Sequence, residues 1–491
     1  MLQKVQENIA TSGFTPYQAD LLRSYARAIN TLASTDGGLR VTPEQFGGVQ
    51  AAIDYVFSEG GGEVFLGAQT YTEQVTLYAN VHLVGVGRKS IIKAPAATPG
   101  NTVNIAGNYC GMSSLVIDCA DAAAGAQGIF SSGWSDCYIR NVRVSAPPAH
   151  GLWVFNGSDW AIHGLTVDGA GDWAILFDGS SFYRLRAFDL YCLNGSDRGV
   201  MCRSIKDSQI HGVWGLDNRA TALWFLDCDN CQAFGVIDRN DLVGDSAVIE
   251  GASTGCFIYG VDARDCGGHG ASISSTSTAG PKSCHIIGVW SDRQGESMAV
   301  ISDQGSGFQP TDCSIVNVKG KDCGRVTPYE AFGIGNAVLC RIQGSIFSTA
   351  GTMTYAVRET GGSPSSNIFE IDGWVSGTSG YFQLGSSTST IVFPRLEGRV
   401  DHKGDADVSW SPNTDGTIVV FDLAALTAAR SITLANAWSG YELLVSRPAA
   451  GAFNLSVKNA GGTTLKTLAA AKQCRLSFDG SNWVVVSSGD V

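Results

Sequence analysis

One short pattern recurs eleven times between Cys110 and Trp374, and it limits the folds that this chain can adopt. Each copy places apolar residues at its first and third positions, a small residue or Asn at its fifth, and usually Val or Leu at its sixth. The spacing of 23 to 29 residues between copies is typical of solenoids, propellers and arrays. The copies begin at Cys110, Cys137, Trp160, Tyr183, Ser208, Cys231, Cys256, Cys284, Cys313, Cys340 and Phe369.

The pattern within each copy has the period of a β-strand, because apolar and polar positions alternate instead of recurring three and four residues apart. Each unit also holds two further short apolar runs, such as residues 151–155 and 174–177, separated by Gly, Asp, Asn and Ser. One unit therefore supplies about three strands and three turns. Since no unit can bury its own inner face, neighbouring units must stack. The sequence predicts an all-β chain with a right-handed parallel β-helix, its coils about 4.8 Å apart.

The composition limits the classes of ligand that this chain is expected to bind. The chain has 491 residues, 16% of them charged, and a net charge of −12, which argues against a nucleic acid partner. A neutral or acidic sugar polymer stays open, because local Arg and Lys can outweigh the total charge. The first residues show no basic stretch followed by an apolar core, and no apolar run approaches the roughly 20 residues that span a bilayer. We expect no signal peptide and no membrane insertion.

Fourteen cysteines suggest disulfides or metal sites at first sight. Seven of them open a copy of the repeat, five in successive units (Cys231, Cys256, Cys284, Cys313 and Cys340), which predicts an interior column of small apolar side chains. The single CxxC, Cys228 to Cys231, has no second pair to complete a zinc site. We therefore expect no metal and no cofactor. Four others near the turns, namely Cys119, Cys192, Cys266 and Cys323, are expected to be half-exposed.

The chain divides into four segments. Residues 1–46 form an N-terminal segment with a predicted helix at 15–32. Residues 47–109 hold a capping helix, at 49–57, and the first coils. The repeats occupy residues 110–400. Residues 401–491 begin with a polar connector and then read as about seven short strands separated by turn signals, which predicts a small β-sandwich or jelly-roll-like unit.

The capping segment carries a family resemblance. Its helix, Gly60-Gly61-Gly62, a strand, the "TYT" at residues 70–72 and "NVHLVGVGRKSIIKA" at 80–94 resemble the entry to the pectate-lyase-like β-helices found in phage tailspikes and polysaccharide depolymerases. The resemblance implies polysaccharide binding or cleavage along the side of the solenoid, a homotrimer and a place in a virion tail, with contacts to tail or baseplate proteins. The ending "FDGSNWVVV" resembles C-terminal modules of phage tail appendages, which trimerise, protect the tip or bind sugar. No catalytic residue is carried over.

Candidate chemistry lies on the outer face, where each repeat leaves its first strand. Two polar columns flank the turn there and predict a groove for an extended sugar chain. The first column contains Asp118, Asp168, Asp217, Arg239, Asn240, Arg264, Asp265, Asp292, Arg293, Lys321 and Asp322. The second contains His150, Asp172, Asp197, Arg219, Asp245, His269, Glu296 and Glu330. Trp214 and Trp290 occupy outward positions from which they could stack on sugar rings.

The densest acidic group supplies the catalytic candidates Asp241, Asp245, Asp265, Asp292 and Glu296. Carboxylates in adjacent coils lie about 5 Å apart and those two coils apart about 10 Å. These separations bracket the roughly 5–5.5 Å of retaining and the roughly 6.5–9.5 Å of inverting glycosidases. Arg239, Arg264, Arg293 and His269, with both tryptophans, are the candidate substrate-binding residues. If the polymer contains uronic acids, β-elimination with an Arg, Lys or His269 as base is the rival reaction.

A purely structural interpretation competes with catalysis. Asp and Asn suit turns, and alternating Asp and Arg in stacked coils can form a ladder of ion pairs. Three functional hypotheses follow: a tailspike-type depolymerase of capsule, exopolysaccharide or O-antigen; a non-catalytic receptor-binding fibre on the same fold; and a bacterial surface-glycan lyase or hydrolase.

Overall fold

The computed structural model describes most of the chain from residue 39 onward, so the predicted helix at 15–32 lies outside the described residues. The described ranges are 39–324, 330–347, 355–360, 364–374, 380–383, 389–392, 400–403, 406–411, 418–421, 426–437, 441–447 and 452–490. Over these residues the protein is an all-β parallel solenoid of about 14 turns, followed by a C-terminal sheet domain. The predicted fold class is confirmed.

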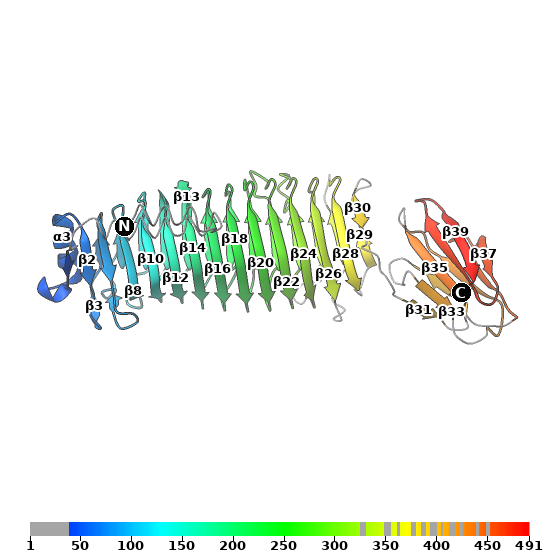
Figure 1. Ribbon diagram of the computed structural model, residues 1–491, viewed down its shortest axis with the longest axis horizontal. Helices are drawn as coiled ribbons and strands as arrows, with labels where there is room; N and C mark the ends of the chain where they lie inside the picture. Colours follow the sequence, from blue (N-terminus) through cyan, green and yellow to red (C-terminus); the bar gives the residue numbers. More distant parts are fainter. Residues whose placement is uncertain are drawn as a thin grey trace, which may run out of the picture.

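Two long parallel sheets run along the solenoid, and Figure 1 shows their strands stacked side by side. The larger, sheet A, contains the repeated pattern: β1 (Arg40–Val41), β2 (Gly62–Phe65), β3 (Thr70–Thr72), β5 (Val81–Val84), β6 (Ile91–Lys93), β8 (Gly111–Asp118), β10 (Tyr138–Ser145), β12 (Ala161–Asp168), β14 (Arg186–Leu193), β16 (Gln209–Leu216), β18 (Gln232–Arg239), β20 (Phe257–Arg264), β22 (His285–Asp292), β24 (Ser314–Lys321), β26 (Arg341–Phe347), β28 (Ile368–Trp374) and β30 (Thr390–Val392). The solenoid thus begins at β1, within the segment assigned above to the N-terminal region.

The second sheet, sheet B, takes the shorter apolar run of each unit. Its strands are β4 (Val75–Leu77), β7 (Val103–Ile105), β9 (Ile129–Ser132), β11 (Leu152–Ser158), β13 (Ile175–Tyr183), β15 (Val200–Arg203), β17 (Leu223–Leu226), β19 (Ala247–Glu250), β21 (Ala271–Ser274), β23 (Ala299–Ser302), β25 (Phe332–Gly335), β27 (Tyr355–Thr360) and β29 (Gly380–Gln383). The third predicted strand is reduced to a column of single parallel bridges that runs from Tyr183 through Lys206 and Asp229 to Ser365.

The small-or-Asn position of the repeat is a bend inside the sheet A strands from β8 to β24. Residues there have a positive φ, for example Asn141 at 51°, Gly212 at 67° and Gly235 at 72°. Gly, Asn and Asp adopt this left-handed conformation most readily, because a Cβ otherwise crowds the following carbonyl. The requirement explains why the position rejects larger residues.

The strand register corrects two of the eleven copies. Ala161 pairs with Arg186, and Arg341 pairs with Ile368, so the units expected at Tyr183 and Phe369 begin two residues away, at Leu185 and Asn367. A shift of two residues keeps every side chain on the same face but changes its neighbour. Phe188, and not Arg186, therefore lies between His163 and His211.

Cysteines line one interior column, as expected. All fourteen are free and buried. Cys231 illustrates the role: its thiol donates to the carbonyl oxygens of Ile205 in the preceding coil and Asp229 two residues earlier, both at 3.4 Å. A small side chain with a weak donor fits a corner where carbonyls converge. The expected half-exposure of Cys119, Cys192, Cys266 and Cys323 is wrong, because their thiols point into the core.

A helix closes the first coil, as the sequence predicts. Helix α3 (Val49–Ser58) buries Val49, Ala52, Ile53 and Val56 against the solenoid core. Its first backbone N–H groups, those of Val49 and Gln50, donate to the carboxylate of Glu73 at 2.7 and 3.0 Å. This satisfies donors that a helix start leaves open. A short 3-10 helix, η1 (Pro43–Gln45), precedes it. Within the described residues, no helix has the length and apolar character needed to span a membrane.

The C-terminal unit has two sheets around one core that contains Trp410, Leu443, Leu455 and Phe478. The five-stranded sheet contains β31 (Val400–Lys403), β33 (Ile418–Phe421), β35 (Glu442–Arg447), β38 (Lys472–Phe478) and β39 (Trp483–Asp490), and the four-stranded sheet β32 (Val408–Trp410), β34 (Arg430–Leu434), β36 (Leu455–Lys458) and β37 (Thr464–Leu468). The strands from β31 to β36 alternate between the sheets and pair in parallel. The unit therefore starts as a coil and only its last three strands pair antiparallel, unlike a jelly roll.

The bend position predicts a specific pattern of tolerance. A Cβ at Gly235 would meet nothing closer than the Gly212 nitrogen at 4.0 Å, so backbone conformation alone limits substitution there. Gly235→Val should lower the free energy of unfolding by about 1–2 kcal/mol more than Gly235→Asn does. Chemical denaturation of both variants measures the difference. Equal losses would show that the left-handed bend is not the constraint.

Candidate functional site

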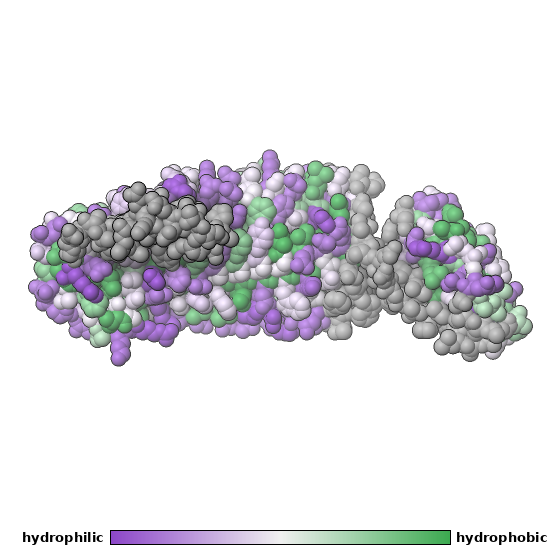
Figure 2. Space-filling model, viewed as in Figure 1, coloured by the Kyte–Doolittle hydropathy of each residue, from purple (hydrophilic) through white to green (hydrophobic). Residues whose placement is uncertain are grey.

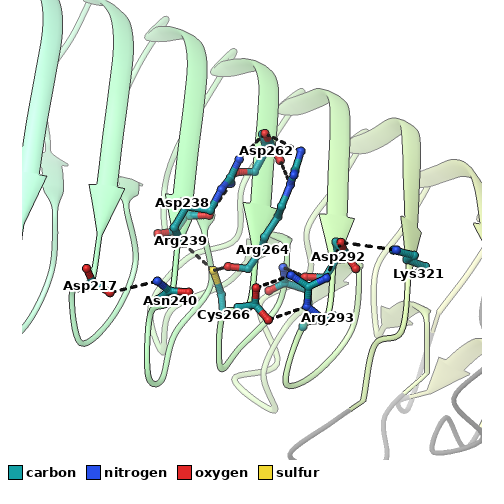
Figure 3. Close-up of polar contacts among 12 residues, drawn as sticks. Asp217, Asp238, Arg239, Asn240, Asp262, Arg264, Cys266, Asp292, Arg293 and Lys321 are labelled. Carbon is teal, nitrogen blue, oxygen red and sulfur yellow. Dashed lines mark hydrogen bonds and ion pairs between the residues drawn. The ribbon is translucent and has the colours of Figure 1, made fainter.

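The first predicted polar column is a ladder of ion pairs across adjacent coils (Figure 3). Arg239 on β18 and Arg264 on β20 both bind the carboxylate of Asp262, with Arg264 Nε at 2.9 Å from Asp262 Oδ1. Arg239 also donates to the backbone carbonyls of Asp238 and Asp262. The guanidinium groups of these two predicted substrate-binding residues are therefore engaged within the protein.

The next coils continue the ladder. Arg293 binds both carboxylate oxygens of Asp265, with Nε at 2.7 Å from Oδ1, and its Nη1 lies 3.0 Å from Asp292 Oδ2. Lys321 Nζ lies 4.0 Å from the same oxygen of Asp292, whose side chain is only 8% exposed. Two of the predicted catalytic carboxylates, Asp265 and Asp292, are thus neutralised by neighbouring cations.

Turn geometry explains why polar residues gather in this column. Asp217, Asn240, Asp265, Arg293 and Asp322 follow their strands with φ between 54° and 60°. Asn and Asp enter this conformation more readily than most side chains. Turn preference and ion pairing therefore account for the column, and catalytic or binding roles for Asp265, Asp292, Arg239, Arg264 and Arg293 stay predictions.

Asp241 does not lie on the outer face where the sequence placed it. It is 2% exposed and adjoins Asp238, which is fully buried. Asp238 accepts the thiol of Cys266 at 3.4 Å, and Asp241 accepts the backbone N–H of Asn218 at 3.2 Å. Burial, and then the mutual repulsion of the two carboxylates, raises the pKa of Asp241, and burial also raises the pKa of Asp238. The pair belongs to the interior.

The tryptophans predicted to bind sugar lie on the outward face of sheet A. Trp290 is 43% exposed, whereas Trp214 is half-buried and stacks on Tyr191 with ring centroids 5.8 Å apart. A second aromatic ladder runs beside them through His163, Phe188, His211, Phe234 and Tyr259. Figure 2 shows hydrophobic surface between the more hydrophilic long edges of the solenoid.

Side chains suited to acid-base chemistry lie closer together in the second predicted column. In the strand register, the residues two positions before each sheet B strand stack in one line, which we call the strand-entry column. It consists of His150, Trp173, Arg198, Thr221, Asp245, His269, Ser297 and Glu330. Glu296 immediately precedes Ser297. The turns that place these residues contain six or seven residues in the coils from β12 to β23, so the spacing between columns is held nearly constant.

Three of the predicted site residues meet here, two from this column and Glu296 from the position beside it. One side-chain ligand atom from each of Asp245, His269 and Glu296 lies within 4.8 Å of the other two, and all three side chains are half-exposed. They come from three successive coils. His269 Nε2 is 3.1 Å from Glu296 Oε2, and Asp245 Oδ1 accepts the backbone N–H of His269 at 2.9 Å. We call these residues the triad.

The hydrogen bonds of His269 indicate its tautomer. Nδ1 accepts the backbone N–H of Ser297 at 3.0 Å, so the proton of a neutral ring lies on Nε2, which is 3.1 Å from Glu296 Oε2. By distance, the triad could hold a divalent cation. Ligation through Nε2 would move the ring proton to Nδ1, against the Ser297 N–H, so this arrangement favours an acid-base group over a metal site.

Burial tunes the acidity of the neighbouring carboxyl groups. Desolvation raises the pKa of Glu296, and the charges of Asp245 and Glu330 add to the rise while His269 opposes it. Glu250, the last residue of β19, has its pKa raised to about 7 by burial and by Asp245. Glu330 is 8% exposed, and its Oε2 lies 3.8 Å from Arg358 Nη1. With its pKa of about 7, Glu250 keeps a proton near neutral pH, as a general acid must.

Sequence reasoning missed four residues beside the triad: Trp173, Arg198, Trp224 and Glu250. Arg198 lies over both indole rings, 4.7 Å from the Trp173 centroid and 4.5 Å from that of Trp224. Two of them had a signal in the sequence, because Trp224 and Glu250 occupy outward positions of the second apolar run of their units.

Comparison with known proteins finds similar solved structures but no matching family. No family model matches the chain, and no curated protein sequence matches it. Similar solved structures include the A-module of the Azotobacter vinelandii mannuronan C-5 epimerase AlgE4 (17% identity, 71% of this chain and 99% of that chain, TM-score 0.41), bacteriophage CBA120 tailspike protein 3 (11%, 92% and 69%, 0.41) and a Thermotoga maritima exopolygalacturonase (12%, 72% and 91%, 0.35). At such identities and TM-scores these similarities do not decide the reaction.

The buried pair Asp238 and Asp241 predicts that the fold loses stability at alkaline pH. Because the folded-state pKa of Asp241 is raised, the stability gained from its protonated form is complete below about pH 4, the ordinary range, and is lost as the pH rises through the raised value. Asp241→Asn keeps the acceptor for Asn218 and removes the titration. The variant should unfold at a higher temperature than the wild type at pH 9, and the difference should shrink at pH 5. Asp217→Asn, an exposed control, should show no such trend.

Proposed function

We propose that the protein is a tailspike-type depolymerase that binds a bacterial surface polysaccharide and hydrolyses its glycosidic bonds at the triad. The observation that carries this proposal is the approach of two carboxylates and an imidazole, from three successive coils, on a half-exposed edge of the solenoid. A solenoid edge offers repeated sites along an extended polymer. The polysaccharide, the homotrimer and the virion tail location follow from the family resemblance and share its status as proposals.

Glu296 is the proposed general acid. Its pKa is raised by burial, and its Oε2 lies 3.1 Å from Nε2 of His269, so we assign the transferable proton to the other oxygen, Oε1. From there it would pass to the glycosidic oxygen as the bond breaks. His269 fixes the orientation of the carboxyl group and is in turn fixed by the Ser297 backbone N–H. It acts as a positioning residue.

Asp245 is the proposed nucleophile. Its Oδ1 is held by the backbone N–H of His269. One oxygen of Asp245 and one of Glu296 lie within 4.8 Å of each other, which is nearer to the roughly 5–5.5 Å between the carboxyl groups of retaining enzymes than to the roughly 6.5–9.5 Å of inverting ones. Asp245 would attack the anomeric carbon, and Glu296 would then activate water to release the sugar.

The triad should dominate activity. Glu296→Gln and Asp245→Asn should each lower the rate of polysaccharide cleavage by at least about 100-fold, the usual range for loss of a general acid or nucleophile. Asp265→Asn, in the ion-pair ladder, should retain most activity. Release of reducing ends from a panel of capsule, exopolysaccharide and O-antigen preparations measures all three. Full activity in both triad variants would remove the triad from the mechanism.

The carboxylate separation predicts the chemistry of the product. Hydrolysis with retention should release the same anomer that the polymer contained, which NMR of the first products detects. New absorbance near 232 nm without a gain of water would instead identify β-elimination. Binding without cleavage of any bound polysaccharide would support the receptor-binding alternative.

A further inference from the structure

We infer that Trp173, Arg198 and Trp224 form a subsite that binds a carboxylate-bearing sugar residue, so that the substrate is an acidic polysaccharide. The inference rests on the proposed function, because it assigns a substrate class to the same edge of the solenoid. It is carried by the geometry and hydrogen-bonding state of Arg198.

The three side chains come from three successive coils. Trp173 precedes β13, Arg198 precedes β15, and Trp224 lies on β17. The two indole centroids are 5.8 Å apart, and the Arg198 guanidinium carbon is 4.7 and 4.5 Å from them. Aromatic faces attract a guanidinium and hold its plane in place. The position of Arg198 is therefore set by its neighbours before any ligand arrives.

The donors of Arg198 are nevertheless open. Within the described residues its guanidinium makes no hydrogen bond, and its only ion pair is a long one, 3.9 Å from Nε to Asp197 Oδ1. Its side chain is 32% exposed. By contrast, Arg203 in the same coil binds both oxygens of the buried Asp178. A guanidinium held against aromatic rings keeps its outer N–H groups for a planar, two-oxygen partner, and a carboxylate matches that fork of donors.

The subsite lies next to the triad. Arg198 and Asp245 share the strand-entry column and are two coils, about 10 Å, apart. Both act on the carboxyl group of Glu250, since Arg198 lowers its pKa and Asp245 raises it. The two half-exposed indoles offer apolar faces for a sugar ring while Arg198 reads its carboxylate. One polymer chain along this edge would contact both sites.

Matched polymers test the charge preference directly. Acidic bacterial polysaccharides would be compared with the same polymers after chemical reduction of their carboxyl groups, using full-length protein carrying Glu296→Gln to prevent turnover. Binding, measured by calorimetry or biolayer interferometry, should weaken about 10-fold to 100-fold when the carboxylates are reduced, as expected for loss of a charged hydrogen-bonded pair. Arg198→Gln should weaken binding of the native polymer by a similar factor and leave binding of the reduced polymer unchanged.

Control variants separate charge, shape and folding. Arg88→Gln, which changes the same net charge at an exposed position near the first coils, should leave binding unchanged. Arg198→Lys should recover only part of the affinity, because an ammonium lacks the fork of donors. Equal thermal unfolding of the Arg198 variants would show that they are folded.

The outcomes distinguish the subsite from the reaction. Carboxylate-dependent binding that is lost in Arg198→Gln, with no cleavage by the unsubstituted protein, would support the subsite and overturn hydrolysis. Cleavage with no effect of either carboxyl reduction or Arg198→Gln would support hydrolysis and overturn the subsite. Failure to bind any acidic polysaccharide would also overturn it.

Discussion

The in-register hydrogen bonding of one coil to the next governs every other feature of this protein. Strands about 4.8 Å apart place each residue directly above its counterpart, so a side chain type repeated along the sequence becomes a column in space. Apolar columns make the core, the cysteine column fills a corner, and left-handed residues form a line of bends. A polar residue has the same few neighbours whether it serves structure or chemistry.

This constraint explains why two similar polar columns differ in use. In the first, opposite charges alternate between coils and neutralise one another, as Asp262, Asp265 and Asp292 do with Arg and Lys. At the strand-entry column Asp245, His269 and Glu296 meet, and among the described residues neither of these two carboxylates forms an ion pair with Arg or Lys. Their repulsion and burial raise the pKa of Glu296 instead of lowering it. Acid-base chemistry is possible at the coils where Arg and Lys do not neutralise the carboxylates.

The sequence predicted the solenoid, the capping helix and the interior cysteines, because these follow from alternation and repeat spacing. It brought Asp245, His269 and Glu296 into one candidate column for the same reason. It could not separate them from Asp265 and Asp292, since pairing depends on which way long Arg side chains turn. It placed Asp241 outside, because one residue of difference at a strand end decides between core and surface. The start of the unit expected at Tyr183 was wrong by two residues, because the first position of that unit holds Leu185 and not Cys.

The repeats differ in length, and in the central coils the extra residues lie on one side of the solenoid. In the central coils the turn before sheet B stays at six or seven residues, while the stretch after it grows: Arg203 and Leu226 precede their bridge residues by three positions, but Ser274 and Ser302 precede theirs by eight and nine. Length variation is therefore confined to the side away from the triad turns, in the coils of His269 and Glu296. Those loops can therefore lengthen without displacing the triad or the core.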